Sequence, residues 1–292
     1  MRILIAGSSG LIGRSLVAEL RAGGHEVRRL VRRAPRAGDE FEWDPPSGRI
    51  DERAFDGLGA AINLCGAPIG RRWSAATKQM IVDSRVEPTD VLAEDVAEHG
   101  VPALINASGV GFYGDTGDRV VDETSPRGQG FLAGLCEAWE AATAPAARAG
   151  ARVVNLRTGL VLGKGGLLGP LKPLFQLGLG GRLGDGRQYM PWIGIADEVG
   201  AIRFLTEHET VSGPVDLCAP EPVTNAEFTR VLGRVLNRPA PWWVPAFALR
   251  AALGEAADEL ALVSQRAVPT VLLEAGYSFA CTELDQALAA AL

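Results

Sequence analysis

A glycine-rich loop directly after the first apolar segment constrains the fold of this chain more than any other feature. The segment Arg2–Ala6 predicts a buried strand, and apolar residues at helical spacing follow over residues 11–20. Between them stand Gly7, Gly10 and Gly13. Glycines here permit a tight turn and let a pyrophosphate approach the helix N-terminus, where free amides and the helix dipole favour negative charge. The sequence therefore predicts a strand, turn and helix that bind a dinucleotide.

Strand and helix patterns alternate along the first half of the chain. Short apolar runs predict strands, longer runs at helical spacing predict helices, and these segments are strands at 25–31, 60–64, 103–106 and 152–156 and helices at 75–98 and 131–149. Strands that alternate with helices form right-handed crossovers and a parallel sheet. We therefore expect an α/β protein whose residues 1–162 form a doubly wound parallel sheet covered on both faces.

The character of the chain changes after residue 162. The stretches 163–166 and 178–186 contain too much glycine for regular elements and predict loops that close over a ligand. From residue 224 the pattern is mostly helical. We expect residues 163–292 to form substrate-side loops and a smaller, mostly helical C-terminal region, which is also free to add strands to the sheet.

Composition excludes several classes of protein. The net charge is -6, with 29 Lys and Arg against 35 Asp and Glu, whereas nucleic-acid binders need a clustered basic surplus. No apolar run approaches the roughly 18 residues of a membrane span, and the apolar start lacks the length of a signal peptide. The four cysteines form no Cys-x-x-Cys pair, so no metal site is indicated. We expect a cytoplasmic protein that binds neither nucleic acid nor membrane.

The end of the second predicted strand carries arginines. Dinucleotide-binding folds that prefer NAD place an acidic residue here against the ribose diol, whereas this chain has Arg32 and Arg33. The guanidinium fork suits a 2′-phosphate, so the pair predicts NADP as the cofactor. The alternative is that these arginines only solvate the end of a strand.

Four motifs carry a family resemblance: Gly7-Ser-Ser-Gly-Leu-Ile-Gly13, Asn63-Leu-Cys-Gly66, Ser108-Gly-Val-Gly-Phe-Tyr-Gly114 and Leu156-Arg-Thr-Gly-Leu-Val-Leu-Gly163. In this order and spacing they resemble the extended short-chain dehydrogenase/reductase family. The resemblance implies a Rossmann-type NADP-binding domain over residues 1–162.

Further motifs resemble a narrower, atypical branch of that family: Arg72-Trp73, Ser84-Arg85, Trp139-Glu140, Gly178-Leu-Gly-Gly181, Pro191-Trp-Ile193, Thr224-Asn-Ala-Glu-Phe228 and Ser264-Gln-Arg-Ala-Val-Pro269. Members of this branch are described as epimerase-like or as nucleoside-diphosphate-sugar epimerases, and they carry a C-terminal extension. The resemblance covers almost the whole chain.

The resemblance also implies a set of cofactor-binding residues. The glycine loop would hold the pyrophosphate, the arginine pair would meet the 2′-phosphate, and the remaining positions would line the adenosine and nicotinamide. These residues are Gly7, Ser8, Gly10, Leu11, Ile12, Gly13, Arg32, Arg33, Leu64, Cys65, Gly66, Arg85 and Leu160.

The acid/base pair of the wider family is missing. That family uses a tyrosine whose phenolate is favoured by a lysine four residues later, because an unperturbed phenol is a poor base at neutral pH. This chain contains no Tyr-x-x-x-Lys, and the corresponding positions fall on about Leu132 and Cys136. The remaining catalytic candidates are Ser108 and Tyr113.

Three interpretations stay open. In the first, an NADP-dependent oxidoreductase or epimerase-like enzyme uses Ser108, Tyr113 or the substrate itself as the proton source; a reductase is then less demanding than an epimerase, because it needs only hydride and a proton. In the second, the chain is a non-catalytic, redox-sensing NADPH-binding module that meets a partner. In the third, the pocket takes a different ligand and the nicotinamide is structural.

The substrate side offers weaker indications. Arg182 and Arg187 flank a glycine-rich turn and could bind the diphosphate of a nucleotide sugar, although surface solvation explains them equally well. Aromatic residues could line a pocket for a small polar substrate, or could equally belong to the core or an interface, and they are Trp73, Tyr189, Trp192, Trp242 and Trp243. A homodimer is compatible with the sequence.

Overall fold

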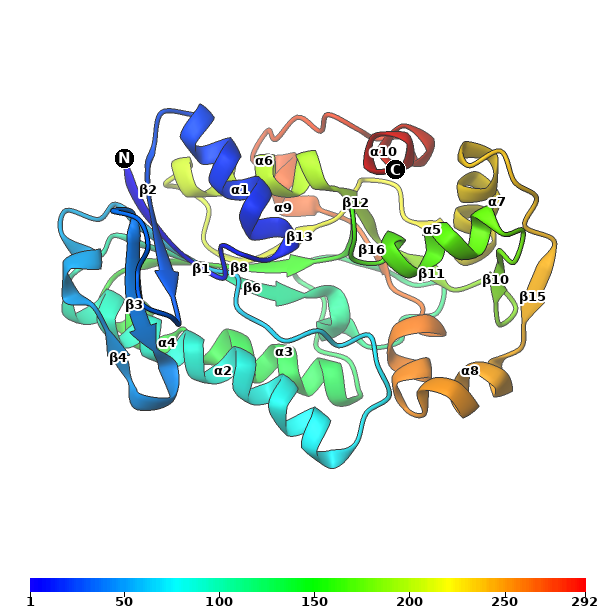
Figure 1. Cartoon of the computed structure of the whole chain (residues 1–292), viewed down its shortest axis with the longest axis horizontal. Helices are drawn as coiled ribbons and strands as arrows, with labels where there is room; N and C mark the ends of the chain where they lie inside the picture. Colours follow the sequence, from blue (N-terminus) through cyan, green and yellow to red (C-terminus); the bar gives the residue numbers. More distant parts are fainter.

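The computed structural model describes residues 1–292, and an eight-stranded sheet lies at its centre (Figure 1). The strand order is β13-β8-β6-β5-β1-β2-β3-β4, and only β3 and β4 pair antiparallel. These strands are β1 (Arg2–Ala6), β2 (Glu26–Val31), β3 (Glu40–Asp44), β4 (Arg49–Ile50), β5 (Ala60–Asn63), β6 (Ala103–Gly109), β8 (Arg152–Thr158) and β13 (Gly213–Leu217). The doubly wound sheet is thus confirmed, and its strand order reverses at β1, between β2 and β5.

Helices cover both faces of the sheet (Figure 1). One layer contains α1 (Leu11–Ala22), α6 (Ile195–Glu207) and α9 (Thr270–Glu274); the other contains α2 (Ala75–Glu98), α3 (Phe131–Ala141) and α4 (Ala144–Arg148). The prediction of one helix over residues 131–149 is wrong, because the chain breaks between α3 and α4. Pro145 has no amide to continue the helical hydrogen bonds, and the Thr143 hydroxyl donates to the Glu140 carbonyl instead (2.7 Å).

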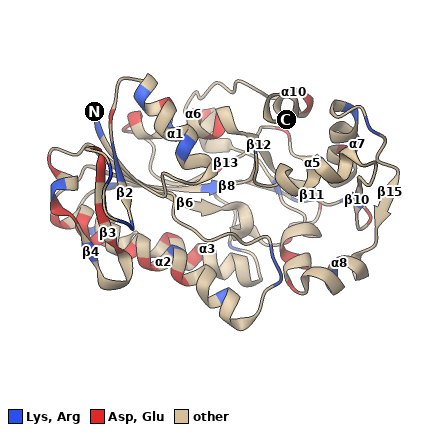
Figure 2. Cartoon of the chain, in the orientation of Figure 1, with Lys and Arg blue, Asp and Glu red and all other residues tan.

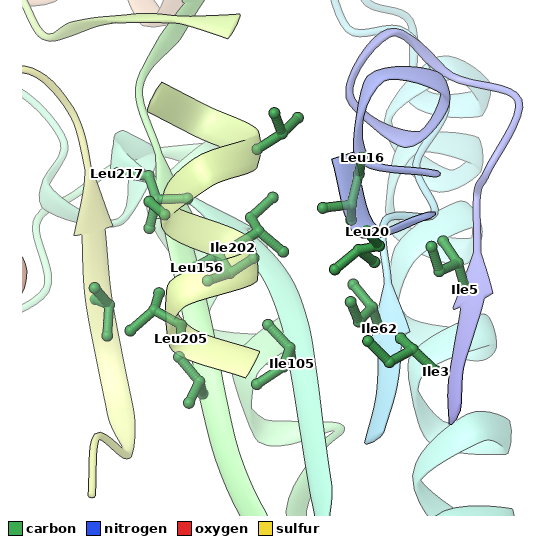
Figure 3. Packing of buried hydrophobic residues seen from close by; sticks show 14 of the residues in the cluster. Ile3, Ile5, Leu16, Leu20, Ile62, Ile105, Leu156, Ile202, Leu205 and Leu217 are labelled. Atoms are coloured by element: carbon green, nitrogen blue, oxygen red, sulfur yellow. The ribbon is translucent and has the colours of Figure 1, made fainter. Parts of the chain in front are cut away.

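The core follows from the alternation of side chains along the buried strands. In β1, Ile3 and Ile5 face the α1 and α6 layer, while Leu4 and Ala6 belong to the cluster on the opposite face, and all four are fully buried. Figure 3 shows the first cluster, in which strand residues meet Leu16 and Leu20 of α1 and Ile202 and Leu205 of α6. Both faces of the sheet are therefore closed, and a ligand can reach it only at the strand ends.

The remaining elements form the smaller side of the molecule and are joined by short strand pairs. The strands are β7 (Val120–Val121), β9 (Leu160–Leu162), β10 (Gly181–Leu183), β11 (Tyr189–Met190), β12 (Trp192–Gly194), β14 (Val223–Thr224), β15 (Trp242–Val244) and β16 (Arg266–Ala267). The helices are α5 (Leu168–Gln176), α7 (Asn225–Val235), α8 (Ala246–Leu253) and α10 (Leu284–Ala291), with a π-helical turn at Ala257–Ala261. Both β13 and α6 lie beyond residue 162. Segments from both sides of the predicted domain boundary therefore contribute to the sheet and to the helices that cover it.

Candidate functional site

The loop after β1 is shaped by glycine. Gly7 has φ +82°, and a Cβ atom there would lie 2.6 Å from the carbonyl oxygen of Leu64. A Cβ atom on Gly13 would collide with the carbonyl oxygen of Gly7 and lie 2.8 Å from Cα of Ser8. The loop is therefore folded tightly against the first turn of α1 and the end of β5.

The N-terminus of α1 is open to an anion. Gly10 is the N-cap residue and carries no side chain to satisfy the amides, and the first turn contains no acidic residue. The first amides of a helix have no partner within it, and together with the helix dipole they favour a phosphate group. The space in front of this helix end is open, because a Cβ atom at Gly10 would meet only the carbonyl oxygen of Gly7, at 3.5 Å.

A cavity of about 970 Å³ begins at this loop and continues toward α5 and α7. Its wall brings together most of the predicted site residues: Gly7, Gly10, Leu11, Ile12, Gly13, Leu64, Cys65, Gly66, Arg85, Ser108 and Leu160. Ser8, Arg32, Arg33 and Tyr113 are not part of the wall. The cavity thus joins the glycine loop, the ends of β5 and β6, and the smaller side of the molecule.

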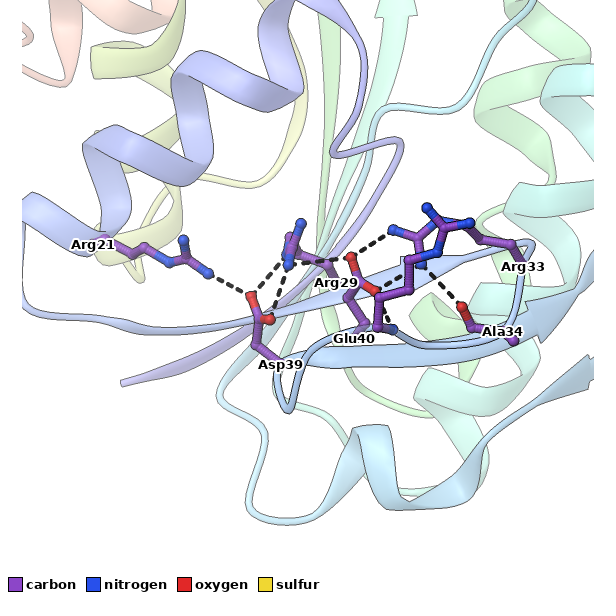
Figure 4. Close-up of polar contacts among 7 residues, drawn as sticks. Arg21, Arg29, Arg33, Ala34, Asp39 and Glu40 are labelled. Carbon is purple, nitrogen blue, oxygen red and sulfur yellow. Dashed lines mark hydrogen bonds and ion pairs between the residues drawn. The ribbon is translucent and has the colours of Figure 1, made fainter.

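The two arginines after β2 differ in their surroundings. Arg33 donates to both carboxylate oxygens of Glu40 (2.8 Å each), and this pairing holds the pKa of Glu40 at about 2. Figure 4 shows the same cluster, in which Arg21 and Arg29 pair with Asp39. Arg32 is exposed and makes no hydrogen bond or ion pair. Only Arg32 of this pair has a guanidinium group that is free for a ligand.

Arg85 projects from α2 to the cavity wall. It donates to the carbonyl oxygens of Ile81 and Ala67 (3.1 Å each), and its guanidinium lies over the ring of Trp139 (5.1 Å). No carboxylate pairs with it, and burial lowers its pKa. Nearby, burial raises the pKa of Cys65 to about 12, which fits a packing role for that thiol.

Ser108 stands at the end of β6 in the cavity wall. Its hydroxyl donates to Glu140 of α3 (2.7 Å), and Arg157 of β8 donates to both oxygens of the same carboxylate (2.8 and 2.9 Å). Leu132 and Cys136, one turn apart on α3, also line the cavity. Burial raises the pKa of Cys136 to about 11, so this helix presents neither an acid/base pair nor a thiolate.

Tyr113 lies behind the wall. Its hydroxyl donates to Asp216 (2.8 Å) and accepts from Arg157 (3.2 Å), and burial raises its pKa above the ordinary range. The hydroxyl is therefore already engaged in the core, an arrangement that does not favour a catalytic role for Tyr113.

A second hydroxyl in the wall is backed by a buried acid. Thr158, at the end of β8, donates to Glu198 of α6 (3.0 Å). Burial raises the pKa of Glu198 to about 8, and its other oxygen has no partner. Burial therefore favours the protonated form of this carboxyl group. Sequence reasoning missed it, because no pattern marks an acid in a helix as facing the core.

Glu259 was also missed, and it comes from the π-helical turn in the C-terminal region. Its two oxygens accept hydrogen bonds from the amides of Phe131 (2.6 Å) and Leu132 (2.7 Å), so it caps α3 across 128 residues of sequence. No local signal links the two segments.

The aromatic pocket predicted from sequence is mostly wrong. Of the five candidates only Tyr189 lines the cavity. Trp192 is buried in the core beside α10, Trp73 packs against Phe131, and the side chains of Trp242 and Trp243 are more than half exposed. Arg182 and Arg187 are likewise absent from the wall.

Two kinds of feature are absent from the structure. No group of three or more His, Cys, Asp and Glu side chains is arranged to hold a metal ion. None of the helices combines the length and the apolar character needed to cross a membrane.

Comparisons with known proteins match this arrangement. The model of the NAD dependent epimerase/dehydratase family matches residues 3–217, and that of the domain of unknown function DUF1731 matches residues 244–291. Epimerase family protein MT2273 of Mycobacterium tuberculosis is 54% identical over 288 residues, which cover 98% of this chain and 96% of that protein.

Two solved structures are similar as well. The crystal structure of human epimerase family protein SDR39U1 with NADPH has a TM-score of 0.91 and 34% identity, and the match covers 100% of this chain and 99% of that one. The structure of a nucleoside-diphosphate sugar epimerase from Corynebacterium glutamicum has a TM-score of 0.83 and 40% identity, with 100% and 58% coverage.

Proposed function

Because the chain belongs to the NAD dependent epimerase/dehydratase family, we propose that it is an NADP(H)-binding oxidoreductase or epimerase-like enzyme acting on a small molecule. The observation that carries the proposal is the continuous cavity from the open N-terminus of α1 to Ser108 and beyond. The human relative that matches the chain almost end to end was solved with NADPH.

The residues of the cavity fit this cofactor. The amides of Leu11, Ile12 and Gly13 would hold the pyrophosphate, since Gly10 leaves that helix end uncovered. Leu64, Cys65 and Gly66 would line the adenosine, with Arg85 beside Gly66. Ser108, near the end of β6, and Leu160, two residues beyond the end of the neighbouring strand β8, would flank the nicotinamide.

Replacing Arg32 with glutamate tests the preference for NADP. Arg32 is the unpaired guanidinium at the end of β2, so we propose that it meets the 2′-phosphate. Arg32→Glu is expected to weaken NADPH binding by roughly a hundredfold and NADH binding little, because only NADPH carries the 2′-phosphate. Isothermal titration with both cofactors measures this. Arg36→Glu, an exposed neighbour, is the control, and equal losses for NADPH and NADH would remove Arg32 from this role.

The proposed chemistry is reduction of a carbonyl group or its reverse. The bound nicotinamide supplies or accepts the hydride. Ser108 lies in the wall beside the proposed position of the substrate oxygen, and its hydroxyl donates to Glu140, which Arg157 holds in place. To hold a carbonyl oxygen, this hydroxyl turns from Glu140 and donates to the substrate. Thr158 is backed by Glu198, whose pKa burial raises to about 8. For proton transfer the hydrogen bond between them reverses: protonated Glu198 gives its proton to Thr158, and the Thr158 hydroxyl proton passes to the substrate oxygen.

Ser108→Ala tests the positioning role. Oxidation of NADPH by a carbonyl substrate is expected to slow by roughly tenfold or more, while NADPH affinity changes less than about twofold. Absorbance of NADPH in the presence of a carbonyl compound collection provides the rate. Ser47→Ala, in which a surface hydroxyl bonded to Asp44 is lost, should leave the rate unchanged. Full turnover by Ser108→Ala would exclude the residue from the mechanism.

A second candidate function is a non-catalytic, redox-sensing NADPH-binding module. The presence of Leu132 and Cys136 in the cavity wall, at about the positions of the missing acid/base pair, favours it. The same absorbance experiment separates the two functions, because only an enzyme oxidises NADPH faster when a substrate is added.

A further inference from the structure

The cavity contains very few charged groups. Arg71, Arg85 and Glu259 are the only charged residues in its wall. Glu259 is fully used by the amides of α3, and Arg85 lies beside Gly66 on the cofactor side. NADP(H) itself carries three phosphate groups. The positive charges of Arg71, Arg85 and nearby Arg32 are therefore all needed to neutralise the phosphates of the cofactor. A second phosphorylated ligand would find no further cation in the wall, because the guanidinium of Arg266, which lies 4.7 Å from the ring centroid of Tyr189, is not part of it.

The part of the cavity away from the glycine loop, here called the substrate half, is apolar. Its wall comes from α5, β11, α7, α8 and the π-helical turn, and the side chains include Leu171, Phe175, Met190, Phe228, Leu253 and Leu260. Between Gly165 and Gly181 the single charged residue is Lys172, whose ammonium donates to the carbonyl oxygen of Leu292 (2.6 Å). In Figure 2 the Asp and Glu positions are densest along α2 and around β3, and a few others lie beside α8.

Backbone groups do not replace the missing cations. The helix α5 begins at the cavity, but its third residue is Pro170, which has no amide, and the amide of Gly169 already donates to Gly165 (3.1 Å). This helix end therefore offers a diphosphate fewer donors than α1 does.

Polar side chains in the substrate half are also occupied. Gln188 donates to the carbonyl oxygens of Leu183 and Ala261, and Asn225 accepts from the amide of Leu183. The hydroxyls of Tyr189 and Thr229 are exceptions, because neither makes a hydrogen bond within the protein. The substrate half thus presents an apolar surface with few free polar groups, two of them hydroxyls.

We propose that the substrate half binds an uncharged molecule with an apolar body and a single carbonyl or alcohol group, and not a nucleotide sugar. This rests on the proposed function. In the reduction, the carbonyl carbon gains a hydride from NADPH, the oxygen gains a proton, and NADP⁺ and an alcohol leave.

Ligand binding to the full-length protein saturated with NADPH tests this. Nonanol and UDP-glucose are the probes, and neither can be reduced by NADPH at the alcohol, so binding is measured without turnover. Nonanol is expected to raise the melting temperature and to titrate in calorimetry, whereas UDP-glucose should do neither. Stabilisation by UDP-glucose, or none by nonanol, would overturn the proposal.

Two leucines of α5 provide matched variants. Leu171 lines the cavity and Leu174 does not. Leu171→Gln is expected to weaken nonanol binding by roughly tenfold, because a polar amide replaces apolar contact area, and Leu174→Gln should have no effect. Equal effects of the two variants would assign nonanol to the exposed surface and contradict the proposal. Binding of NADPH is measured separately. If the protein does not bind NADPH, the proposed function is overturned as well. If it binds both NADPH and UDP-glucose, only the proposed substrate class is overturned.

Discussion

Replacing Arg157 with methionine is expected to lower the free energy of unfolding by about 3–5 kcal/mol. The side chain of Arg157 is 5% exposed, donates twice to Glu140, and lies 3.4 Å from the ring centroid of Phe112. It also donates to Tyr113, whose hydroxyl binds Asp216. Although burial alone lowers its pKa, the bonds to Glu140 raise that pKa above the ordinary value. Methionine would leave the Glu140 carboxylate without its cation.

Denaturant unfolding of both proteins measures this loss. Arg230→Met removes an exposed ion pair with Glu227 and should change stability little. A double variant, Arg157→Met with Glu140→Gln, should recover part of the loss because the uncompensated charge is gone. A loss below about 1 kcal/mol in the single variant would contradict this account of the network.

Gly13→Ala is expected to abolish stabilisation by NADPH, which for the native protein is about 2.7 kcal/mol at a hundred times the dissociation constant. The added methyl group would collide with the carbonyl oxygen of Gly7 and press on Ser8, so the loop must move away from the first turn of α1. The amides would then lose their common direction toward the pyrophosphate. Thermal unfolding with and without NADPH provides the measurement.

Gly169→Ala is the matched control. Gly169 is a helical glycine of α5, and an added Cβ atom meets no other heavy atom within 4 Å. We expect unchanged or slightly higher stability and an unchanged NADPH response. If Gly13→Ala unfolds too easily for this test, hydrogen exchange of the backbone amides in the loop after β1 should still be faster in the variant than in the native protein. A variant whose loop exchanges at the native rate, yet which does not bind NADPH, would contradict the steric explanation.

Much of the fold could be predicted because its signals are local. The glycines between β1 and α1 and the apolar runs of the buried strands reflect needs of their own segments. The strand β3, second from the edge of the sheet, was not predicted, although Phe41 and Trp43 alternate with acidic residues, since a strand of five residues carries little pattern. The break before α4 was missed because Pro145 is tolerated in the first turn of a new helix as readily as it ends an old one.

The residues of the candidate site could be predicted only where their position in a motif determines whether they face the cavity. The glycine loop and Ser108 follow strand ends, which point into the cavity. Tyr113 ends the 3₁₀ turn Val110–Tyr113, which directly follows the strand of Ser108, and this turn directs its hydroxyl to Asp216 in the core. The roles of Glu198 and Glu259 depend on packing between distant segments, and the sequence contains no local trace of them.

The capping of α3 by Glu259 affects how the sequences of such chains can evolve. The carboxylate belongs to the stretch 244–291 that matches one family model, whereas α3 belongs to the stretch 3–217 that matches the other. A recombination event that exchanged the C-terminal stretch for another sequence would leave the start of α3 uncapped and remove Leu253 and Leu260 from the cavity wall. The two stretches are therefore coupled as one inherited unit, and a substitution in either one restricts the substitutions that the other can accept.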